Sequence, residues 1–254
     1  MTEHLEKGHY RARWATTAAD TEAAMRLRHL CFMVAGGGQS RDDGLDRDDF
    51  DARCRHLLIE EREGDHLAGC CRLMHLSGGS EIGASYSAQY YELSGLSGFA
   101  GPMLELGRFC IRPGLNDPDI LRVAWAALTR AVDATGVELI FGCSSFAGTE
   151  TDRYLDAFGL LSDRHVAPRR WLPRVKAPRV FRFAETLRRA HHQTDRKSGL
   201  QRMPPLLRSY LAMGGWVSDH AVVDTDLNTL HVFTGLEIRA IPEARARALR
   251  LVAD

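Results

Sequence analysis

A strand–helix–strand pattern in the middle of the chain constrains the fold more than any other feature. The run Met103–Ile111 alternates enough to form a central strand, and Arg112-Pro113-Gly114 ends it. A helix is predicted from about Asp119 to Gly136, because apolar residues recur at helical spacing. The apolar run Val137–Cys143 follows as a short strand. A right-handed crossover between the two strands predicts a parallel pair with a functional edge at the strand ends.

The N-terminal part of the chain predicts a strand, a helix and a hairpin. Tyr10–Thr16 has the composition of a strand, and the next helix is expected to have Asp20 as its N-cap and to end by Gly36. A mobile, acid-rich loop is predicted after this helix. It leads to two strands, Cys54–Ile59 and His66–Leu73, which we expect to pair as a hairpin.

The C-terminal half contains a basic, proline-rich segment that we predict to be an excursion from the core. It covers about 164–204 and has one short amphipathic helix near Val180–Ala190. A helix at Pro205–Met213 and strands at Ala221–Val223 and Leu230–Phe233 are predicted beyond it. The 254 residues are expected to form one domain, 1–254, of the α/β (α+β) class.

The charges are separated along the chain although they sum to zero. Residues 164–202 contain twelve Lys and Arg and two acids, a net charge of +10, whereas residues 42–65 contain ten Asp and Glu. Such a chain is expected to have a basic face and an acidic locus. No window reaches the roughly 18 apolar residues of a spanning helix, and the start lacks an apolar signal segment, so we expect a cytoplasmic protein.

Cysteine spacing and the absence of common motifs exclude several kinds of site. The six cysteines lack paired CxxC spacing, so we predict reduced, mostly buried thiols rather than a zinc site or a disulfide framework. They are Cys31, Cys54, Cys70, Cys71, Cys110 and Cys143. No P-loop, GxGxxG, HExxH or GxSxG motif occurs. We expect no metal ion and no nucleic-acid partner.

Three carboxylates, Asp46, Asp48 and Asp51, stand in the acidic loop. One interpretation is a solvated, flexible surface. The other is a binding site for a cationic small molecule, since clustered carboxylates attract an ammonium group and accept its hydrogen bonds. An EF-hand calcium loop is disfavoured, because the glycine and glutamate that it requires are missing.

Two opposite charges, Glu105 and Arg108, interrupt the apolar central strand. They are three residues apart, so a regular strand places them on opposite faces. A buried structural ion pair is one interpretation, and a general base or substrate-orienting group at Glu105 is the other. Arg28 and Arg72 are the expected partners of the carboxylates, with ordinary surface positions as the alternative.

A series of short segments carries a family resemblance over about residues 10–235. The segments are Leu27-Arg28-His29-Leu30-Cys31-Phe32, Phe50-Asp51, Cys54-Arg55-His56-Leu57-Leu58, Arg72-Leu73, Tyr86-Ser87, Glu105-Leu106-Gly107-Arg108-Phe109-Cys110, Trp125, Phe141–Thr149 and Pro204-Pro205-Leu206-Leu207-Arg208-Ser209-Tyr210-Leu211. Together they resemble the bacterial L-ornithine Nα-acyltransferases of ornithine lipid synthesis. The resemblance implies a GNAT fold: a mixed, mostly antiparallel sheet flanked by helices, with a splayed parallel strand pair as the acyl-donor site. It also implies transfer of a 3-hydroxyacyl group from acyl carrier protein to the α-amine of ornithine, giving lyso-ornithine lipid.

A more distant similarity, to the acyl-homoserine lactone synthases, implies roles for individual residues. Their pattern of an Arg on the first helix, an acidic triplet, an Arg after the hairpin and a Glu-x-x-Arg strand has counterparts throughout this chain. These are Arg28; Asp46, Asp48 and Asp51; Arg72; and Glu105 with Arg108. The implied catalytic pair is Glu105 and Arg108, and the others are implied to bind the amino acid. The first acid of the triplet is usually Glu in those enzymes and is Asp46 here.

The implied acyl donor is carried on the 4'-phosphopantetheine of acyl carrier protein, so no cofactor is expected to be bound. The Q/RxxGxG/A loop that holds the pyrophosphate of coenzyme A in other GNAT enzymes is missing, and residues 112–119 stand in its place. The residues expected to line the acyl and phosphopantetheine path are Phe32, Phe109, Cys110, Ile111, Ser144, Ser145 and Phe146. For Ser144 and Ser145 an ordinary turn at the strand end is the alternative.

The basic segment is expected to contact acyl carrier protein, an anionic membrane surface, or both. The residues expected to make this contact are Arg179, Arg182, Phe183, Leu187, Arg188 and Arg189. Their helical pattern fits a helix lying in a membrane interface, and equally a surface helix whose apolar stripe packs on the core. The first interpretation predicts a peripheral protein on the inner face of the cytoplasmic membrane. Another acceptor such as glutamine, and a non-catalytic membrane-binding module, remain as alternative functions.

Overall fold

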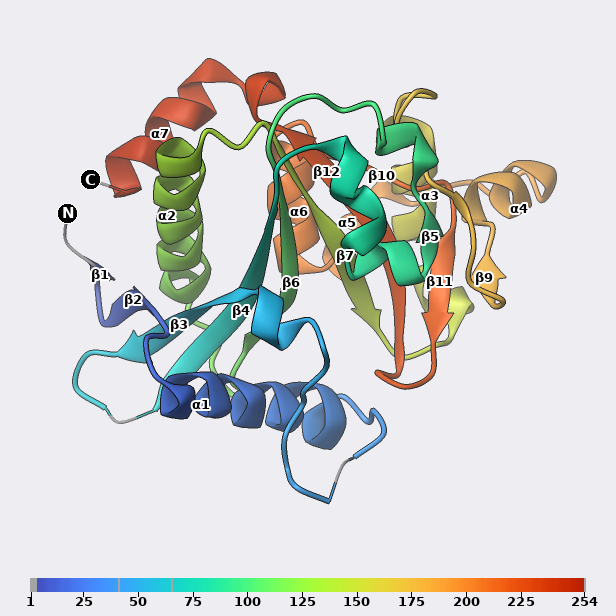
Figure 1. Cartoon of the computed structure of the whole chain (residues 1–254). Helices are drawn as coiled ribbons and strands as arrows, with labels where there is room; N and C mark the ends of the chain where they lie inside the picture. Colours follow the sequence, from blue (N-terminus) through green and yellow to red (C-terminus); the bar gives the residue numbers. More distant parts are fainter. Residues whose placement is uncertain (1–3, 41, 65, 254) are drawn as a thin grey trace. The chain divides into compact units, whose positions relative to one another are not determined.

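The computed structural model describes residues 4–40, 42–64 and 66–253, which form two compact units (Figure 1). The first unit comprises residues 1–75, 106–137 and 242–254, and the second comprises 76–105 and 138–241. Strand β6 (Met103–Ile111) contributes its beginning to the second unit and its end to the first. That the chain forms a single domain stays a prediction.

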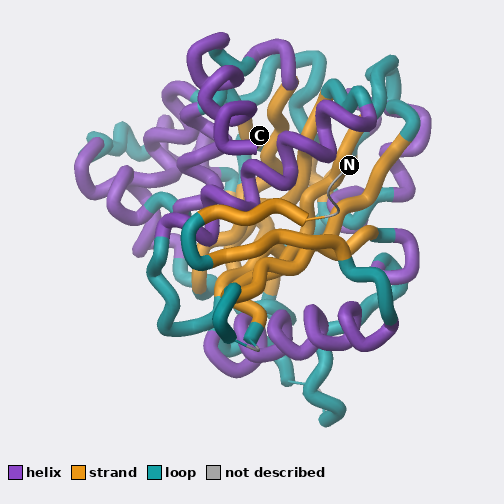
Figure 2. The backbone as a smooth tube through the Cα atoms, turned by 90° about the vertical axis from the view of Figure 1, so that its left-hand side faces the viewer, coloured by secondary structure: helices purple, strands orange, loops and turns teal. Residues whose placement is uncertain are grey.

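The first unit is built on strands in the order β1-β2-β3-β4-β6. Besides β6 they are β1 (His4–Lys7), β2 (Tyr10–Trp14), β3 (Arg55–Glu61) and β4 (Leu67–Leu76). The pairs β1–β2, β2–β3 and β3–β4 are antiparallel, and the first of them lies near the N-terminus in Figure 2. The predicted hairpin of β3 and β4 is therefore confirmed. Asp65, in its acid-rich turn, lies outside the described residues.

Side-chain caps mark the beginnings of two of the three helices described in the first unit, α1 (Ala18–His29) and α2 (Pro118–Thr135). The third helix is α7 (Glu243–Ala253), and a π-helical turn, η1 (Leu30–Ala35), directly follows α1. The prediction that Asp20 is the N-cap of α1 is wrong. Thr17 is the N-cap, and Asp20 is its partner in a capping box, because each side chain accepts a hydrogen bond from the other residue's backbone. Gly136 ends α2 as predicted, with the left-handed φ of 65° that glycine adopts readily.

Strands of the second unit follow the order β6-β7-β12-β11-β9. They are β7 (Leu139–Ala147), β9 (Val180–Phe181), β11 (Ala221–Asp224) and β12 (Thr229–Glu237); β10 (Trp216–Val217) pairs with β12, and β5 (Tyr91–Glu92) pairs with β8 (Arg174–Val175). The predicted parallel pair is β6–β7, in register from Met103–Leu139 to Glu105–Phe141. The other named pairs of this unit are antiparallel. The expected mixed, mostly antiparallel α/β fold is confirmed.

Strand β7 is longer than the sequence predicts. The sequence predicts a strand that ends at Cys143, with a turn at Ser144 and Ser145 as one interpretation. Instead, β7 pairs with β12 along its whole length, from Leu139–Glu237 to Ala147–Thr229. Small and hydroxyl residues favour turns locally. Here a long partner strand supplies hydrogen bonds that outweigh this local preference.

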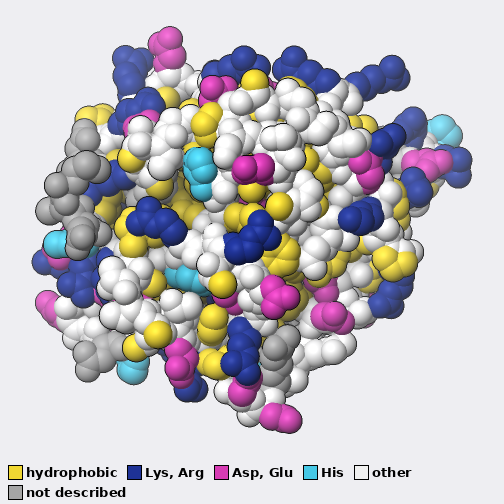
Figure 3. All heavy atoms as spheres, in the orientation of Figure 1, with side chains coloured by type: hydrophobic (Ala, Val, Ile, Leu, Met, Phe, Trp, Pro, Cys, Tyr) yellow, Lys and Arg dark blue, Asp and Glu magenta, His cyan; other side chains and the backbone are white. Residues whose placement is uncertain are grey.

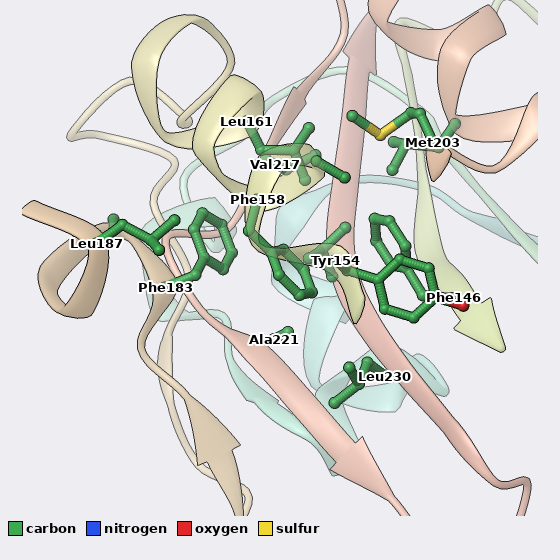
Figure 4. Packing of buried hydrophobic residues seen from close by; sticks show 14 residues of the cluster. Phe146, Tyr154, Phe158, Leu161, Phe183, Leu187, Met203, Val217, Ala221 and Leu230 are labelled. Carbon is green, nitrogen blue, oxygen red and sulfur yellow. The ribbon is translucent and has the colours of Figure 1, made fainter. Parts of the chain in front are cut away.

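The core of the second unit includes part of the basic segment. Helices α3 (Leu155–Arg164), α4 (Phe183–Arg189), α5 (Arg196–Arg202) and α6 (Pro205–Ala212) belong to this unit. Phe183 is fully buried and stacks on Phe158 with a centroid distance of 5.1 Å, and Leu187 joins the same cluster (Figure 4). The interpretation of 164–204 as an excursion outside the core is therefore wrong for this helix. Burial of its apolar side chains stabilises the fold by about 1.5–3 kcal/mol each.

The same burial decides between the two interpretations of α4. Phe183, Ala184 and Leu187 face the core, so the apolar stripe packs inward and the expected membrane contact of Phe183 and Leu187 is corrected. Arg182, Arg188 and Arg189 remain exposed. Among the described residues, no helix is long and apolar enough to cross a membrane.

Candidate active site

Six charged side chains from four parts of the chain meet in the first unit. Arg28 comes from α1, Arg72 from β4, Arg108 from the end of β6, and Asp46, Asp48 and Asp51 from the loop before β3. All six were expected to bind the amino acid or take part in catalysis. Three positive and three negative charges balance. We call this set the arginine–aspartate network.

Arg28 is the most deeply buried member of the network. Its side chain is 1% exposed, and its Nε donates to Asp46 Oδ2 at 2.8 Å. Nη1 and Nη2 both donate to the carboxylate of Asp51, at 2.7 and 3.1 Å. This paired geometry matches the planar fork of a guanidinium to a carboxylate.

Arg72 and Arg108 donate hydrogen bonds to the same three aspartates. Arg72 donates to both oxygens of Asp48, at 2.6 and 2.8 Å, and to Asp51 Oδ1 at 2.8 Å. Arg108 Nε donates to Asp46 Oδ2 at 2.9 Å. Each carboxylate therefore contacts two arginines, which offsets the cost of removing it from water.

The arginines hold the buried carboxylates in their charged form. Burial raises the pKa of Asp46, but the opposite effect of the nearby Arg108 and Arg28 is larger. The pKa of Asp46 therefore lies below its ordinary value of 3.8. The pKa of Asp51 is lowered too, since the effects of Arg28 and Arg72 exceed that of burial. Burial lowers the pKa of Arg28, but Asp51 and Asp46 raise it above its ordinary value.

The acids of the network differ in exposure. Asp46 and Asp51 are buried, so the interpretation of a solvated acidic surface is wrong for them. The side chain of Asp48 is 24% exposed. It lies at an open groove of about 970 Å³ that is also lined by Glu22, Asp49 and Arg55. A cationic ligand would therefore reach Asp48 more readily than the other two acids.

Arg108 has an unusual backbone conformation. Its φ is +51°, in the left-handed region that residues other than glycine seldom adopt. The strand is therefore not regular at Arg108, so the argument that places Glu105 and Arg108 on opposite faces, which requires a regular strand, does not apply. The guanidinium of Arg108 lies 6.0 Å from the ring centre of Phe32. Non-glycine residues in this region are frequent at functional sites.

Glu105 lies in the second unit and has different partners. Its carboxylate is 3% exposed and accepts hydrogen bonds from the backbone N–H of Tyr86 at 2.8 Å and of Ser87 at 2.7 Å. The hydroxyl of Ser87 donates to it at 2.6 Å. These neutral donors fix the orientation of the carboxylate.

The residues expected along the acyl path are divided between the units. In the first unit Phe32, Phe109 and Ile111 are partly exposed and Cys110 is buried. In the second unit Ser145 is exposed, and buried Ser144 accepts a hydrogen bond from Thr234 at 2.9 Å. Phe146 belongs to the core cluster, 5.0 Å from the ring centre of Tyr154 (Figure 4). Its surroundings are those of a core residue.

Two contributors were not assigned a role from the sequence. Ser87 was noted only within the resemblance, and its position beside Glu105 depends on a contact across 18 residues. His56 is buried, and one ring nitrogen lies 3.2 Å from the backbone oxygen of Asp51. Burial lowers the pKa of His56, which keeps the ring neutral at pH 7. In the sequence, His56 was named only within the resemblance, in the segment Cys54-Arg55-His56-Leu57-Leu58.

The described His, Cys, Asp and Glu side chains form no group of three that could hold a metal ion. In the segments described here, the arginine–aspartate network and the Glu105 site are the two buried charged groups that include a predicted catalytic residue.

Comparison with solved structures found an acyl-homoserine lactone synthase and an N-acyl amino acid synthase. A CoA-dependent acyl-homoserine lactone synthase is 14% identical and matches 91% of this chain and 81% of that chain, with a TM-score of 0.48. An N-acyl amino acid synthase from uncultured soil microbes is 9% identical and matches 96% of both chains, with a TM-score of 0.45.

Comparison of sequences gives a closer relationship. Residues 27–126 match the acetyltransferase (GNAT) domain family. The L-ornithine N(alpha)-acyltransferase of Brucella abortus is 27% identical over 92% of this chain and 86% of that protein. The protein of the same name from Rhodobacter capsulatus is 31% identical over 92% of both chains. This chain is therefore an acyltransferase and belongs to the L-ornithine N(alpha)-acyltransferase family.

Proposed function

We propose that this protein transfers a 3-hydroxyacyl chain from acyl carrier protein to the α-amine of L-ornithine. The observation that carries the proposal is the 31% identity to the Rhodobacter capsulatus enzyme over 92% of both chains. In the reaction the amine nitrogen forms an amide bond with the acyl carbon. The thioester bond breaks, and the carrier thiol leaves with a proton. A non-catalytic membrane module is disfavoured by membership in a family of acyltransferases.

The arginine–aspartate network is proposed as the binding site for the amino acid. Asp48 is the partly exposed acid of the network, and it would accept hydrogen bonds from an ammonium group of ornithine. Arg108 is the most exposed of the three arginines, at 10% against 1% for Arg28 and 2% for Arg72. We therefore assign the substrate carboxylate to Arg108. Arg28 and Arg72 hold the acids in place.

Glu105 is proposed as the general base, directly or through a water molecule. The attacking amine must lose a proton, and a carboxylate held in a fixed orientation can accept it. The hydrogen bonds from Tyr86 and Ser87 support this orientation. Backbone N–H groups near the end of β6 are proposed to stabilise the oxyanion that develops on the thioester.

Acyl carrier protein is proposed to dock on the basic segment. All twelve Lys and Arg of residues 164–202 are exposed, and Figure 3 shows Lys and Arg side chains at the surface of the molecule. Acyl carrier proteins are acidic, so such a surface would attract them over several ångströms. The contact is assigned to Arg179, Arg182, Arg188 and Arg189. An anionic membrane is the alternative partner. The proposed location of the protein on the inner face of the cytoplasmic membrane depends on that alternative.

The proposal is tested with purified protein, 3-hydroxyacyl carrier protein and single amino acids. Release of free carrier thiol that depends on ornithine, with an N-acylornithine product identified by mass, is the expected result. Dependence on glutamine instead would replace the acceptor and keep the reaction class. No thiol release with any amino acid would contradict the proposed function.

A further inference from the structure

Three cysteines, Cys31, Cys70 and Cys110, pack together in the first unit. The Sγ atoms of Cys70 and Cys110 lie 3.6 Å apart on the neighbouring strands β4 and β6. Cys31, in the π-helical turn η1, donates a hydrogen bond to the backbone oxygen of Ile111, the residue after Cys110, at 3.4 Å. It also packs against the buried cluster that contains Cys70 and Cys110. Cys110 was expected to line the acyl path, and no thiol of the three takes part in the proposed bond-making and bond-breaking steps of acyl transfer.

The three thiols differ in access to solvent. Cys31 is partly exposed, whereas Cys110 is 6% exposed and Cys70 is fully buried. The hydrogen bond from Cys110 lowers the pKa of Cys31 below its ordinary value, against the effect of burial and with help from Arg112. The pKa of Cys110 is raised well above its ordinary value by its contacts with Cys31 and Cys70 and by burial. An accessible thiol with a lowered pKa beside a buried second thiol has the arrangement of an oxidisable cysteine with a resolving partner.

From this geometry we propose that Cys31 is a site of oxidation by peroxide and that it closes a disulfide with Cys110. In the first step the Cys31 thiolate attacks one peroxide oxygen, the O–O bond breaks, and hydroxide leaves and takes up the thiol proton to give water. Cys31 is then a sulfenic acid. In the second step Cys110 sulfur attacks Cys31 sulfur, the S–O bond breaks, and a second water is released. The two thiols together lose two electrons and two protons, and one peroxide is reduced to two waters.

Closure of this bond would change the arginine–aspartate network through the backbone. A disulfide has an S–S length of about 2.0 Å, so both thiols must move closer than any non-bonded sulfur contact. Cys110 is two residues after Arg108 on β6, and Cys31 precedes Phe32, whose ring lies under the Arg108 guanidinium. Arg108 also has the strained φ of +51°. The oxidised protein is expected to lose on the order of tenfold in kcat/KM for the amino acid, because a small misplacement of a positioning group lowers the rate steeply.

The test oxidises the intact protein with one equivalent of hydrogen peroxide and maps cross-linked peptides under non-reducing conditions. A Cys31–Cys110 disulfide, with acyltransferase activity that falls and is restored by dithiothreitol, is the expected result. Dimedone added with the peroxide should trap the sulfenic acid at Cys31. Because the disulfide and the dimedone adduct are read by mass, they can be assessed even if the amino acid acceptor proves to be different.

Two variants separate the proposed pair from general thiol oxidation. Cys31→Ser should retain its basal activity and resist inactivation by peroxide, whereas Cys70→Ser should still form the Cys31–Cys110 bond. Cross-links that map to Cys54 or Cys143, or a dimedone adduct at another cysteine, would overturn the assignment. A Cys31–Cys110 disulfide that leaves kcat/KM unchanged would overturn its effect on the network.

Discussion

The arginine–aspartate network of the first unit and the basic segment of the second use charge in opposite ways. In the network three arginines and three aspartates balance, and Arg28 and Asp51 are almost fully buried. In the basic segment all twelve cations are exposed. Among the described residues, three of these twelve have an acidic partner: Arg170, Arg174 and Arg189. Both regions are rich in charged residues in the sequence, but only the charges of the network are buried and hold buried segments together.

The difference follows from the cost of removing charge from water. A buried guanidinium is stable only with carboxylates in good geometry, so the network fixes the loop that carries its acids. An exposed arginine keeps its hydration and a field that extends about 8–10 Å at physiological salt. We therefore expect changes in the network to alter folding and substrate binding, and changes in the basic segment to alter association with partners.

Arg28→Ala should have the largest effect, because it leaves Asp46 and Asp51 buried with fewer opposite charges. Loss of one partner from a buried ion pair costs about 3–5 kcal/mol. Urea denaturation measures the free energy of unfolding. Arg26→Ala, at an exposed position on the same helix, is the matched control and should change stability by less than about 1 kcal/mol. Equal effects of the two substitutions would remove the contrast between buried and exposed arginines.

Glu105→Gln tests a buried carboxylate that accepts hydrogen bonds from Tyr86 and Ser87. The substitution keeps the shape of the side chain and removes the proposed base, so turnover should fall on the order of a hundredfold. Thermal unfolding and circular dichroism check that the variant is folded. Near-normal turnover in a folded variant would refute the assignment as base, and a collapsed fold would assign Glu105 a structural role.

Acid should weaken the arginine–aspartate network, because its carboxylates lose their charge when they take up protons. The pKa of Asp51 lies below its ordinary value of 3.8 in the folded protein, so its ion pairs contribute full stability above that pH. This contribution is lost as the pH falls from about 4 through the lower pKa of the folded state. The stability difference between wild type and Asp51→Asn should therefore be largest near pH 6 and shrink below pH 4. A difference that is independent of pH would contradict the ion-pair explanation.

Asp48→Asn tests the exposed edge of the network. The KM for the amino acid should rise about tenfold, which corresponds to about 1.4 kcal/mol, while the KM for the acyl donor stays unchanged. Asp49→Asn, at the neighbouring exposed acid of the groove, is the matched variant with a smaller expected effect. A changed donor KM with an unchanged acceptor KM would reverse the assignment.

Reversal of Arg182, Arg188 and Arg189 to Glu should leave stability almost unchanged and raise the KM for acyl carrier protein several-fold. The effect should decrease as salt rises, because the contact is electrostatic. Reversal of Arg26, Arg245 and Arg247, which are exposed in the other unit, is the matched control. A normal carrier KM with lost binding to anionic vesicles would make the membrane the partner of this surface.

The central strand–helix–strand segment could be predicted from the sequence because its signals lie within the segment itself. Apolar spacing and the glycine at 136 are sufficient to place α2. By contrast, the end of β7 depends on pairing with β12, and the burial of Phe183 depends on Phe158 in α3. These contacts join residues far apart in the chain. No local pattern contains them.

The candidate site could be predicted as a set of residues but not as a geometry. The family resemblance supplied the members of the network and the Glu105 position. It did not predict that Asp46 and Asp51 would be buried while Asp48 is partly exposed. The hydrogen bonds of Glu105 to residues 86 and 87 also depend on how a separate loop folds back.

The left-handed backbone at Arg108 also limits which residues can evolve at this position. Glycine adopts a φ of +51° without the penalty of about 1–2 kcal/mol that a side chain incurs, but it has no guanidinium. Lysine keeps the penalty and the charge and loses the second donor group. No natural amino acid combines an unstrained main chain at this position with the contacts that Arg108 makes to Asp46 and Asp48. In a library of variants, selection for thermal stability and selection for catalysis should therefore favour different residues at this one position.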